Sequence, residues 1–318
     1  MPDDPDESFV IHTVLNSRPR GAAPSVAEGA ETLIPLAPGD DAACVPGNSV
    51  VTVDAMVEGV HWDDKLSPAD VGWKLIAANA SDINAMAAIP QWAVLTMCLP
   101  RPLDRDWVQQ FASGLGEALE QWSIQLVGGD TTRSTSGRML SLTMSGTTST
   151  PVGRCGAKHD DDIWVSGPLG GAAAAFCIED MDTHALRRPH PPVGLGHALG
   201  QAHLATSMMD LSDGLSRDLP RLCKASGVGA VIEHASLPAH ASLQSVADPL
   251  PLMVGFGEEY ELLFTASPHH RNEVETTGVA FGKEMTRIGT INTDTQAGPQ
   301  LDLGHWPAPL FSHFEERA

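Results

Sequence analysis

Residues 67–90 read SPADVGWKLIAANASDINAMAAIP, and this stretch decides how the first half of the chain is interpreted. Ser67 followed by Pro68 is typical of a helix N-cap and first helical position. The residues that follow keep steps of four, three and four along one helical face: Val71, Leu75, Ala78 and Asp82. We predict a helix that packs against a core, and we expect the acid on its apolar face to have a partner.

The segments on either side predict a mixture of strands and helices. Residues 49–54 (SVVTVD) and 91–99 are rich in strand-forming residues, and Pro100 closes the second segment. Residues 104–122 carry apolar side chains at helical spacing, and residues 123–127 predict a short strand that runs into Gly128-Gly129-Asp130. This order predicts an α+β fold for the first half of the chain.

The composition changes near residue 150, where residues 147–156 are small and polar. A chain of 318 residues is long enough for about two domains. We therefore predict an N-terminal domain over residues 1–150 and a C-terminal domain over residues 151–318. The second is predicted to alternate strands (162–166, 230–233, 260–265 and 287–291) with helices (170–178, 192–206 and 212–226).

Charge and cysteine usage exclude several classes of protein. The chain has 19 Lys and Arg against 40 Asp and Glu, a net charge of −21, which repels nucleic acid and anionic membranes. The five cysteines are isolated and form no CxxC pair, which argues against a disulfide framework or structural zinc. The acidic start and the absence of an apolar run of about 20 residues favour a cytoplasmic protein without a membrane or nucleic-acid partner.

Aspartate recurs beside Gly, Ser or Thr at the predicted ends of strands and helices. Each segment alone is typical of a cap or a turn. Together the acids predict one shared site, in which divalent cations such as Mg²⁺ would offset the repulsion between carboxylates. The candidates are Asp40, Asp54, Asp82, Asp130, Asp210 and Asp213, with Thr52 on the same strand face as Asp54.

Other candidate residues have both a functional and a structural interpretation. The chain has no GxxxxGK[ST] and no GxGxxG opening a helix, so phosphate binding would need metals and basic residues such as Arg154 and Lys158. Either of these cations is otherwise a solvated surface charge. His61 is a packed residue beside Trp62 or a chemical one, and Glu258 belongs to a charged turn or to a site. Trp306 is either a core residue or a stacking surface for an aromatic ligand.

Seven segments give the chain a family resemblance. They are GDDAA (39–43), VEGVHW (57–62), SDINAMAAIP (81–90), VGGDTTRS (127–134), GAK…VSGPLGGAAA (156–174), DLSDGLSRDL (210–219) with ASGVGA (225–230), and GEEYELLFT (257–265). In this order they resemble the thiamine-monophosphate kinases, in the superfamily of aminoimidazole ribonucleotide synthetase. Glu259 departs from the family's usual GEDYE.

The resemblance implies a two-domain α+β subunit. Its N-terminal α+β domain, with a mixed sheet, would pair with a twin in a homodimer, and its C-terminal α/β domain would cover the nucleotide. The implied reaction is transfer of a phosphoryl group from ATP to thiamine monophosphate, giving thiamine diphosphate, with several Mg²⁺ ions. The acceptor is a phosphate monoester that is largely a dianion near pH 7, so we expect direct in-line transfer without a general base.

The resemblance also implies roles for individual residues. Those matching metal ligands are Asp40, Thr52, Asp54, Asp82, Asp130, Asp210 and Asp213. Gly129, Arg154 and Ser212 match positions that meet ATP, and Asp130 and Arg154 are the catalytic candidates. His61, Glu258 and Trp306 match positions that meet the thiamine compound, although Trp306 is offset and Phe311 is an alternative to it.

The sequence also allows three rival interpretations. One is a synthetase of the same superfamily that activates an amide or carbonyl oxygen with ATP, and another is a metal- or nucleotide-binding homologue without turnover. The third, selenophosphate synthesis, is disfavoured because a reactive cysteine is expected near the N-terminus, and no cysteine precedes Cys44.

Overall fold

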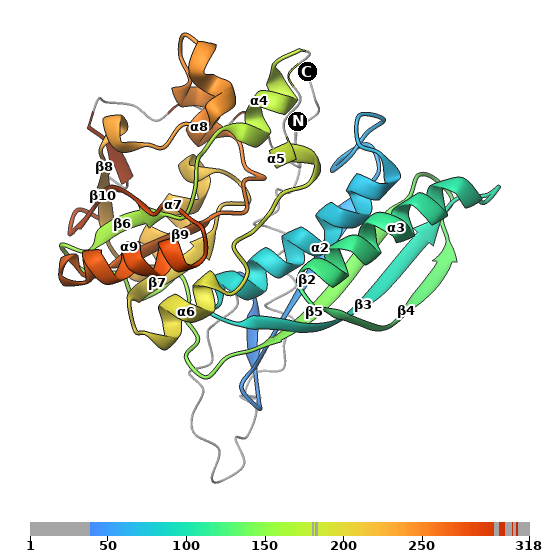
Figure 1. The fold of residues 1–318 in the computed structure, drawn as a ribbon, viewed down its shortest axis with the longest axis horizontal. Coiled ribbons are helices and arrows are strands. Elements are labelled where there is room, and N and C mark those ends of the chain that lie inside the picture. Colours follow the sequence, from blue (N-terminus) through green and yellow to red (C-terminus); the bar gives the residue numbers. More distant parts are fainter. Residues whose placement is uncertain are drawn as a thin grey trace, which may run out of the picture.

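The described part of the chain consists of two sheets with helices packed against them (Figure 1). The computed structural model describes residues 39–179, 181, 184–295, 299–302, 307 and 310. Strands and helices alternate with mixed sheet pairings in both halves, so the predicted α+β class is confirmed. Within the described residues, no helix combines the length and the apolar character that crossing a bilayer requires.

The first sheet has five strands in the order β1-β2-β5-β3-β4. Only β3 and β4 pair in parallel, and the other pairs are antiparallel. The strands are β1 (Ala43–Val45), β2 (Ser49–Val57), β3 (Ile89–Leu99), β4 (Gln125–Arg133) and β5 (Met139–Thr147). This mixed sheet leaves β1 and β4 as its two edges.

Helices α2 (Pro68–Ala85) and α3 (Arg105–Gln121) cover one face of this sheet. The predicted N-cap is confirmed, because the Ser67 hydroxyl accepts the backbone N–H of Asp70 at 3.2 Å. The two helices cross closely: a Cβ on Gly114 would lie 1.9 Å from the carbonyl oxygen of Ala69. The opposite face is open, since Val53 is 62% exposed and every residue of β4 is exposed.

The second sheet has six strands in the order β11-β8-β10-β6-β9-β7, and only β11 and β8 pair in parallel within it. The strands are β6 (Asp162–Val165), β7 (Ala205–Asp210), β8 (Gly229–Ile232), β9 (Leu262–Ala266), β10 (Thr286–Asn292) and β11 (Pro299–Leu301). Alternate residues of β6 face opposite sides: Ile163 and Val165 pack with α7, and Trp164 packs with α6 and α9. The sheet is therefore buried on both faces.

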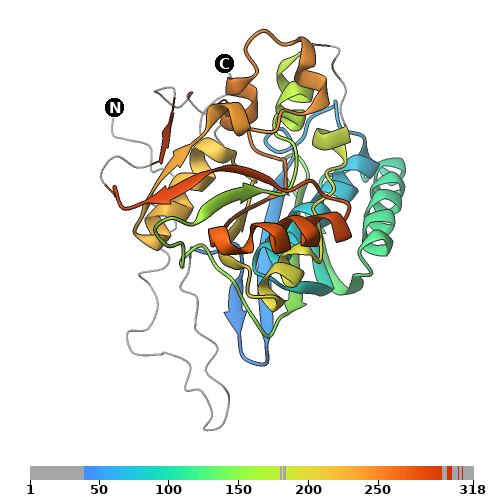
Figure 2. The ribbon, with the colours of Figure 1, turned by 60° about the vertical axis from the view of Figure 1, so that its left-hand side comes forward.

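Short helices surround the second sheet. One face carries α7 (Leu215–Ser226) with α8 (Leu250–Gly255), and Figure 2 shows α6 (Leu195–Gln201) and α9 (Arg271–Ala280) beside each other in front of the sheet. The remaining helices are α4 (Gly171–Cys177), α5 (His184–Arg187) and the 3-10 turns η1 (His234–Ser236), η2 (Ala241–Ser245) and η3 (Pro268–His270).

Helix α2 joins the two halves. Near its C-terminus, the Asn84 side-chain oxygen accepts the N–H groups of Gly194 and Gly196, both at 3.0 Å. Near its N-terminus, the Trp73 indole N–H donates to the carbonyl of Pro189 at 2.9 Å. Ala85 also belongs to the core cluster that lies under α6 and α9. The helix is thus a structural member of both halves.

Three predicted element ends are wrong. Strand β2 continues to Val57, so Asp54 lies inside the strand and not at its end. Strand β4 runs through Gly128-Gly129-Asp130 to Arg133, because glycine lets β4 approach β3 closely: a Cβ on Gly129 would lie 2.0 Å from the Leu95 carbonyl oxygen. The predicted helix over 192–206 is only α6, and β7 begins at Ala205.

Candidate functional site

Three buried carboxylates from distant parts of the sequence meet where the two halves join. Asp41 precedes β1, Asp82 lies on the last turns of α2, and Asp210 ends β7. One carboxylate oxygen from each lies within 4.8 Å of the others. This cluster, Asp41–Asp82–Asp210, answers the sequence expectation that the acid on the apolar face of α2 has a partner.

Hydroxyl groups hold the cluster in place. The Thr52 hydroxyl donates to the Asp82 carboxylate at 2.6 Å, and the Ser81 hydroxyl donates to Asp210 at 2.6 Å. Because Ser81 is on α2 and Asp210 is on β7, the second bond spans the two halves. Asp210 is fully buried, and its other carboxylate oxygen has no hydrogen-bond partner within the described residues.

The protein environment disfavours the ionised form of these acids and raises their pKa values. Burial and the nearby Asp210 carboxylate together raise the pKa of Asp41 to about 7. Burial likewise raises the pKa of Asp210 and of Asp54 to about 6. Burial and the neighbouring Asp54 raise the pKa of Asp82 well above its ordinary value. Removing water from like charges has this effect, which the positive charge of Arg154 only partly offsets at Asp41 and Asp210.

The cluster has the chemistry of a site for a hard divalent cation. All its ligand atoms are carboxylate oxygens, which is the donor type that Mg²⁺ prefers. Two carboxylate oxygens of these residues, Asp41 Oδ2 and Asp210 Oδ1, are buried without a hydrogen-bond partner in the described part of the chain. A buried, unpaired carboxylate oxygen is costly, and a bound cation would satisfy it.

Arg154 organises the loop that carries Asp40 and Asp41. Its backbone N–H donates to the Asp40 carboxylate at 2.6 Å, and its guanidinium group donates to the Gly39 carbonyl at 2.6 Å and pairs with Asp41. The Asp41 side chain is only 2% exposed. Asp41, which we did not single out as a ligand, therefore reaches the cluster, while the Asp40 carboxylate is bonded to the Arg154 backbone.

Two predicted ligands border the cluster from other elements. Asp54 on β2 lines a cavity that Asp82 also lines. Asp213, in the turn after β7, lines the same cavity and forms an ion pair with Arg221 of α7. Ser212 lines this cavity as well, so the DLSD turn contributes both a cluster residue and a cavity wall.

The structure does not bring Asp130 and Gly129 to the cluster within one chain. Asp130 lies on the exposed edge strand β4, in register with Thr96 of β3, Ser141 of β5 and Ala55 of β2. Three strand spacings put it about 14 Å from β2. Because Ala55 and Asp54 point to opposite faces, Asp130 lies on the open face, away from the cluster.

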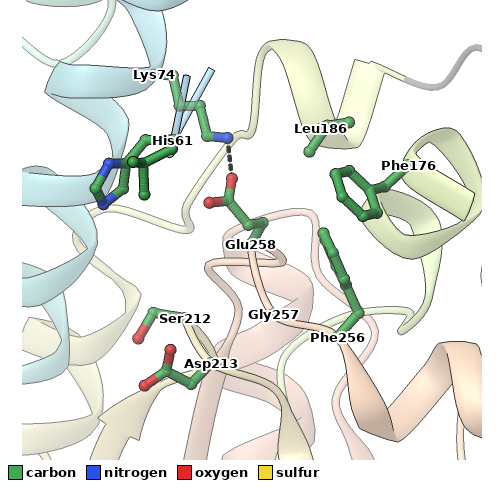
Figure 3. Close-up of a pocket in the computed structure, with 10 residues that line it drawn as sticks. His61, Lys74, Phe176, Leu186, Ser212, Asp213, Phe256, Gly257 and Glu258 are labelled. Atoms are coloured by element: carbon green, nitrogen blue, oxygen red, sulfur yellow. Dashed lines mark ion pairs between the residues drawn. The ribbon is translucent and has the colours of Figure 1, made fainter. Parts of the chain in front are cut away.

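A cavity continues from the cluster between α2 and the segment before β9 (Figure 3). It carries polar groups near the cluster and an apolar end, where the rings of Phe176 and Phe256 lie 4.9 Å apart beside Leu186. Both predicted residues, His61 and Glu258, line it. Trp306 and Phe311 lie outside the described residues.

Local backbone geometry fixes how these side chains are presented. Glu258 and Tyr260 have φ angles of 69° and 52°, a left-handed conformation that is unusual for residues other than glycine. The His61 Nδ1 accepts the backbone N–H of Val57 at 3.1 Å, which makes Nε2 the protonated nitrogen of a neutral ring. Strained backbone of this kind concentrates at functional sites.

Glu259, which departs from the family pattern, has a structural role. Its carboxylate accepts the backbone N–H groups of Gly170 and Ala172, at 2.8 and 3.2 Å, at the start of α4. Burial raises its pKa to about 8. Since α4 carries Phe176, this contact positions the apolar end of the cavity.

Sequence reasoning missed Lys74, which lines the cavity and forms an ion pair with Glu258 (Figure 3). A signal was present, because Lys74, Ala78 and Asp82 are four residues apart and share one face of α2. No sequence pattern distinguished Asp41 as a ligand from its neighbour Asp40.

Comparisons with known proteins agree with this arrangement. Residues 39–148 match the family described as AIR synthase related protein, N-terminal domain, and residues 159–302 match its C-terminal domain. A curated thiamine-monophosphate kinase from Escherichia coli K12 is 35% identical over 286 residues, covering 83% of this chain and 86% of the relative.

Solved structures of thiamine-monophosphate kinases are also similar to this chain. The thiamine-monophosphate kinase of Stenotrophomonas maltophilia K279a has a TM-score of 0.75 at 34% identity, covering 84% of this chain and 90% of that one. A structure described as "AaThiL complexed with AMPPCP and TMP" has a TM-score of 0.78 at 28% identity, covering 95% of each chain. The chain belongs to the thiamine-monophosphate kinase family of the AIR synthase related proteins.

Proposed function

We propose that this chain transfers the γ-phosphoryl group of ATP to thiamine monophosphate, giving ADP and thiamine diphosphate. The observation that carries the proposal is the buried cluster Asp41–Asp82–Asp210, whose Asp82 also lines a cavity that has charged walls and an aromatic end. The kinship with thiamine-monophosphate kinases supports the same reaction.

The main obstacle to this reaction is repulsion between two anions. Two unit charges 4 Å apart repel by about 4 kcal/mol at an effective dielectric of 20, and several such pairs meet when two phosphates approach. Asp41, Asp82 and Asp210 would hold Mg²⁺, which neutralises phosphate charge when bound. The acceptor phosphate is itself the nucleophile, so no side chain has to remove a proton.

The other side chains align the reactants. Arg154 holds the Gly39–Asp41 loop, so it fixes the cluster and places a cation beside it, while the preceding Gly153 accepts the backbone N–H of Met208 in β7. Thr52 and Ser81 orient two of the carboxylates by donating to them. We further propose four additional ligands: Asp40, Asp54 and Asp213 for the metal ions, and Ser212 for ATP.

We also propose that the enzyme acts as a homodimer in which Asp130 and Gly129 serve the partner's site. The exposed β4 edge and the open face of the first sheet, where Val53 and Trp92 are 62% and 40% exposed, support such an interface. All five cysteines have free thiols, which suits the reducing cytoplasm proposed for it.

The reaction is tested by following ADP release and thiamine diphosphate formation with ATP and Mg²⁺. Thiamine monophosphate, thiamine and no acceptor are compared, with Asp210→Asn as the inactive control. Formation of thiamine diphosphate only with the monophosphate is expected. Equal ADP release without an acceptor, or none with the monophosphate, would reject the proposal and favour a rival member of the superfamily.

The shared site is tested by mixing two inactive variants, Asp130→Asn and Asp210→Asn, after dissociation and reassociation. If Asp130 serves the partner's site, each mixed dimer contains one intact site, and about a quarter of wild-type activity returns. If Asp130 acts within its own chain, mixing restores nothing.

A further inference from the structure

Lys74 is a buried cation that the acid cluster does not explain. It is 2% exposed, and its ammonium group forms an ion pair with Glu258, whose side chain is 21% exposed (Figure 3). Burying an ammonium group is costly unless it is paired. The pair joins α2 to the strained segment before β9, and both residues line both parts of the cavity.

The pair lies between the two chemically different ends of the cavity. On one side, Asp82 shares the α2 face with Lys74 and is eight residues away, about 12 Å along the helix. On the other side are the rings of Phe176 and Phe256. A ligand that fills the cavity must therefore pass a positive and a negative side chain placed next to each other.

We propose that Lys74 binds the phosphate of the acceptor, and that the Lys74–Glu258 pair selects a ligand carrying both a cationic ring and a phosphate. This inference rests on the proposed function. In the free protein each side chain neutralises the other. Thiamine monophosphate supplies the opposite charge to each: its phosphate to Lys74 and its thiazolium ring to Glu258.

The same geometry predicts discrimination against thiamine. Thiamine has the cationic ring but no phosphate, so its binding to Glu258 would leave the buried Lys74 ammonium without a counter-ion. Removing one partner of a buried ion pair is strongly unfavourable. The specificity for the monophosphate thus comes from the penalty on the wrong ligand as well as from attraction for the right one.

The test compares equilibrium binding of thiamine monophosphate and thiamine, by calorimetry without nucleotide, in the wild type and Lys74→Met. The matched control is Lys283→Met, which breaks another Lys–Glu pair, with Glu261, outside the cavity. We expect Lys74→Met to weaken binding of the monophosphate by at least about tenfold while thiamine binds as well or better. The control should keep the wild-type ratio.

Steady-state kinetics give a second readout. Lys74→Met should raise KM for thiamine monophosphate and leave KM for ATP within about twofold, and Lys74→Arg should recover part of the loss because it retains the charge. An unchanged ratio of the two affinities in Lys74→Met, or an equal loss for both ligands, overturns the inference. Failure of the wild type to form thiamine diphosphate rejects the proposed reaction instead, and the binding ratios still decide the role of Lys74.

Discussion

Replacing Asp210 by Asn should make the metal-free protein more stable while abolishing its activity. Asp210 is fully buried, and one of its oxygens has no partner within the described residues. An Asn side chain keeps an acceptor for the Ser81 hydroxyl and turns an N–H donor toward the other two carboxylates of the cluster. The variant therefore removes repulsion without leaving a cavity.

The size of the effect follows from the pKa of Asp210, which burial raises from 3.8 to about 6. Between these values the folded protein binds more protons than the unfolded chain, so stability falls as pH rises, and above pH 6 the loss is complete. At about 1.4 kcal/mol per pKa unit, the ionised Asp210 costs about 3 kcal/mol at pH 8 and about half of that at pH 5. Asn does not ionise and avoids this cost.

Thermal unfolding in EDTA at pH 5 and pH 8 measures the difference. We expect Asp210→Asn to raise Tm by several degrees at pH 8 and by less at pH 5. The exposed Asp248→Asn is the matched control and should leave Tm unchanged. Added Mg²⁺ should stabilise the wild type more than the variant. A lower Tm for Asp210→Asn at pH 8 would refute the view that the carboxylates repel one another without a metal.

Other predictions address the site and its surroundings. Mg²⁺ binding, measured by calorimetry, should strengthen from pH 5 to pH 8, because Asp41 and Asp210, with pKa values of about 7 and about 6, must lose their protons before they can bind the ion. A Mg²⁺ affinity that does not change with pH would contradict this. Arg188→Met should reduce the free energy of unfolding by about 1–3 kcal/mol and so lower Tm, because it removes the main ion-pair partner of the buried Asp70. KM for ATP should stay unchanged, and an altered KM would give Arg188 a role in the site. Cys98→Ser should retain full turnover, and a large loss in a folded variant would show a chemical role. Labelled ATP should leave no covalently phosphorylated protein, and trapping one would exclude direct transfer.

The parts of the fold governed by local signals could be predicted from the sequence. The Ser67 N-cap and the helical spacing after it gave α2 correctly, and Gly227 ends α7 in the left-handed conformation expected of a C-cap. The end of β2 and the course of β4 could not be predicted in this way. Their Asp and Gly residues have turn-forming preferences, which pairing with β5 and β3 overrides.

The site was predicted as a set of acids, and the structure adds how they are arranged. Asp82 and Asp210 meet as their motifs suggested, but the third member of the cluster is Asp41, because the Arg154 backbone takes up its neighbour Asp40. Nothing local distinguishes two adjacent aspartates; only the long-range contact with residue 154 does. For the same reason the importance of Lys74 emerges only when Glu258 is placed opposite it.

The double membership of α2 has a consequence for dividing the gene. A fragment ending near residue 150 would carry this helix with Ala85 deprived of the apolar surface that covers it, and with Asn84 facing water in place of the loop before α6. The complementary fragment would expose Leu195, Leu199 and Trp164, which belong to the same core cluster as Ala85. Neither piece should persist as a well-behaved monomer when expressed alone, and co-expression of the two should rescue both.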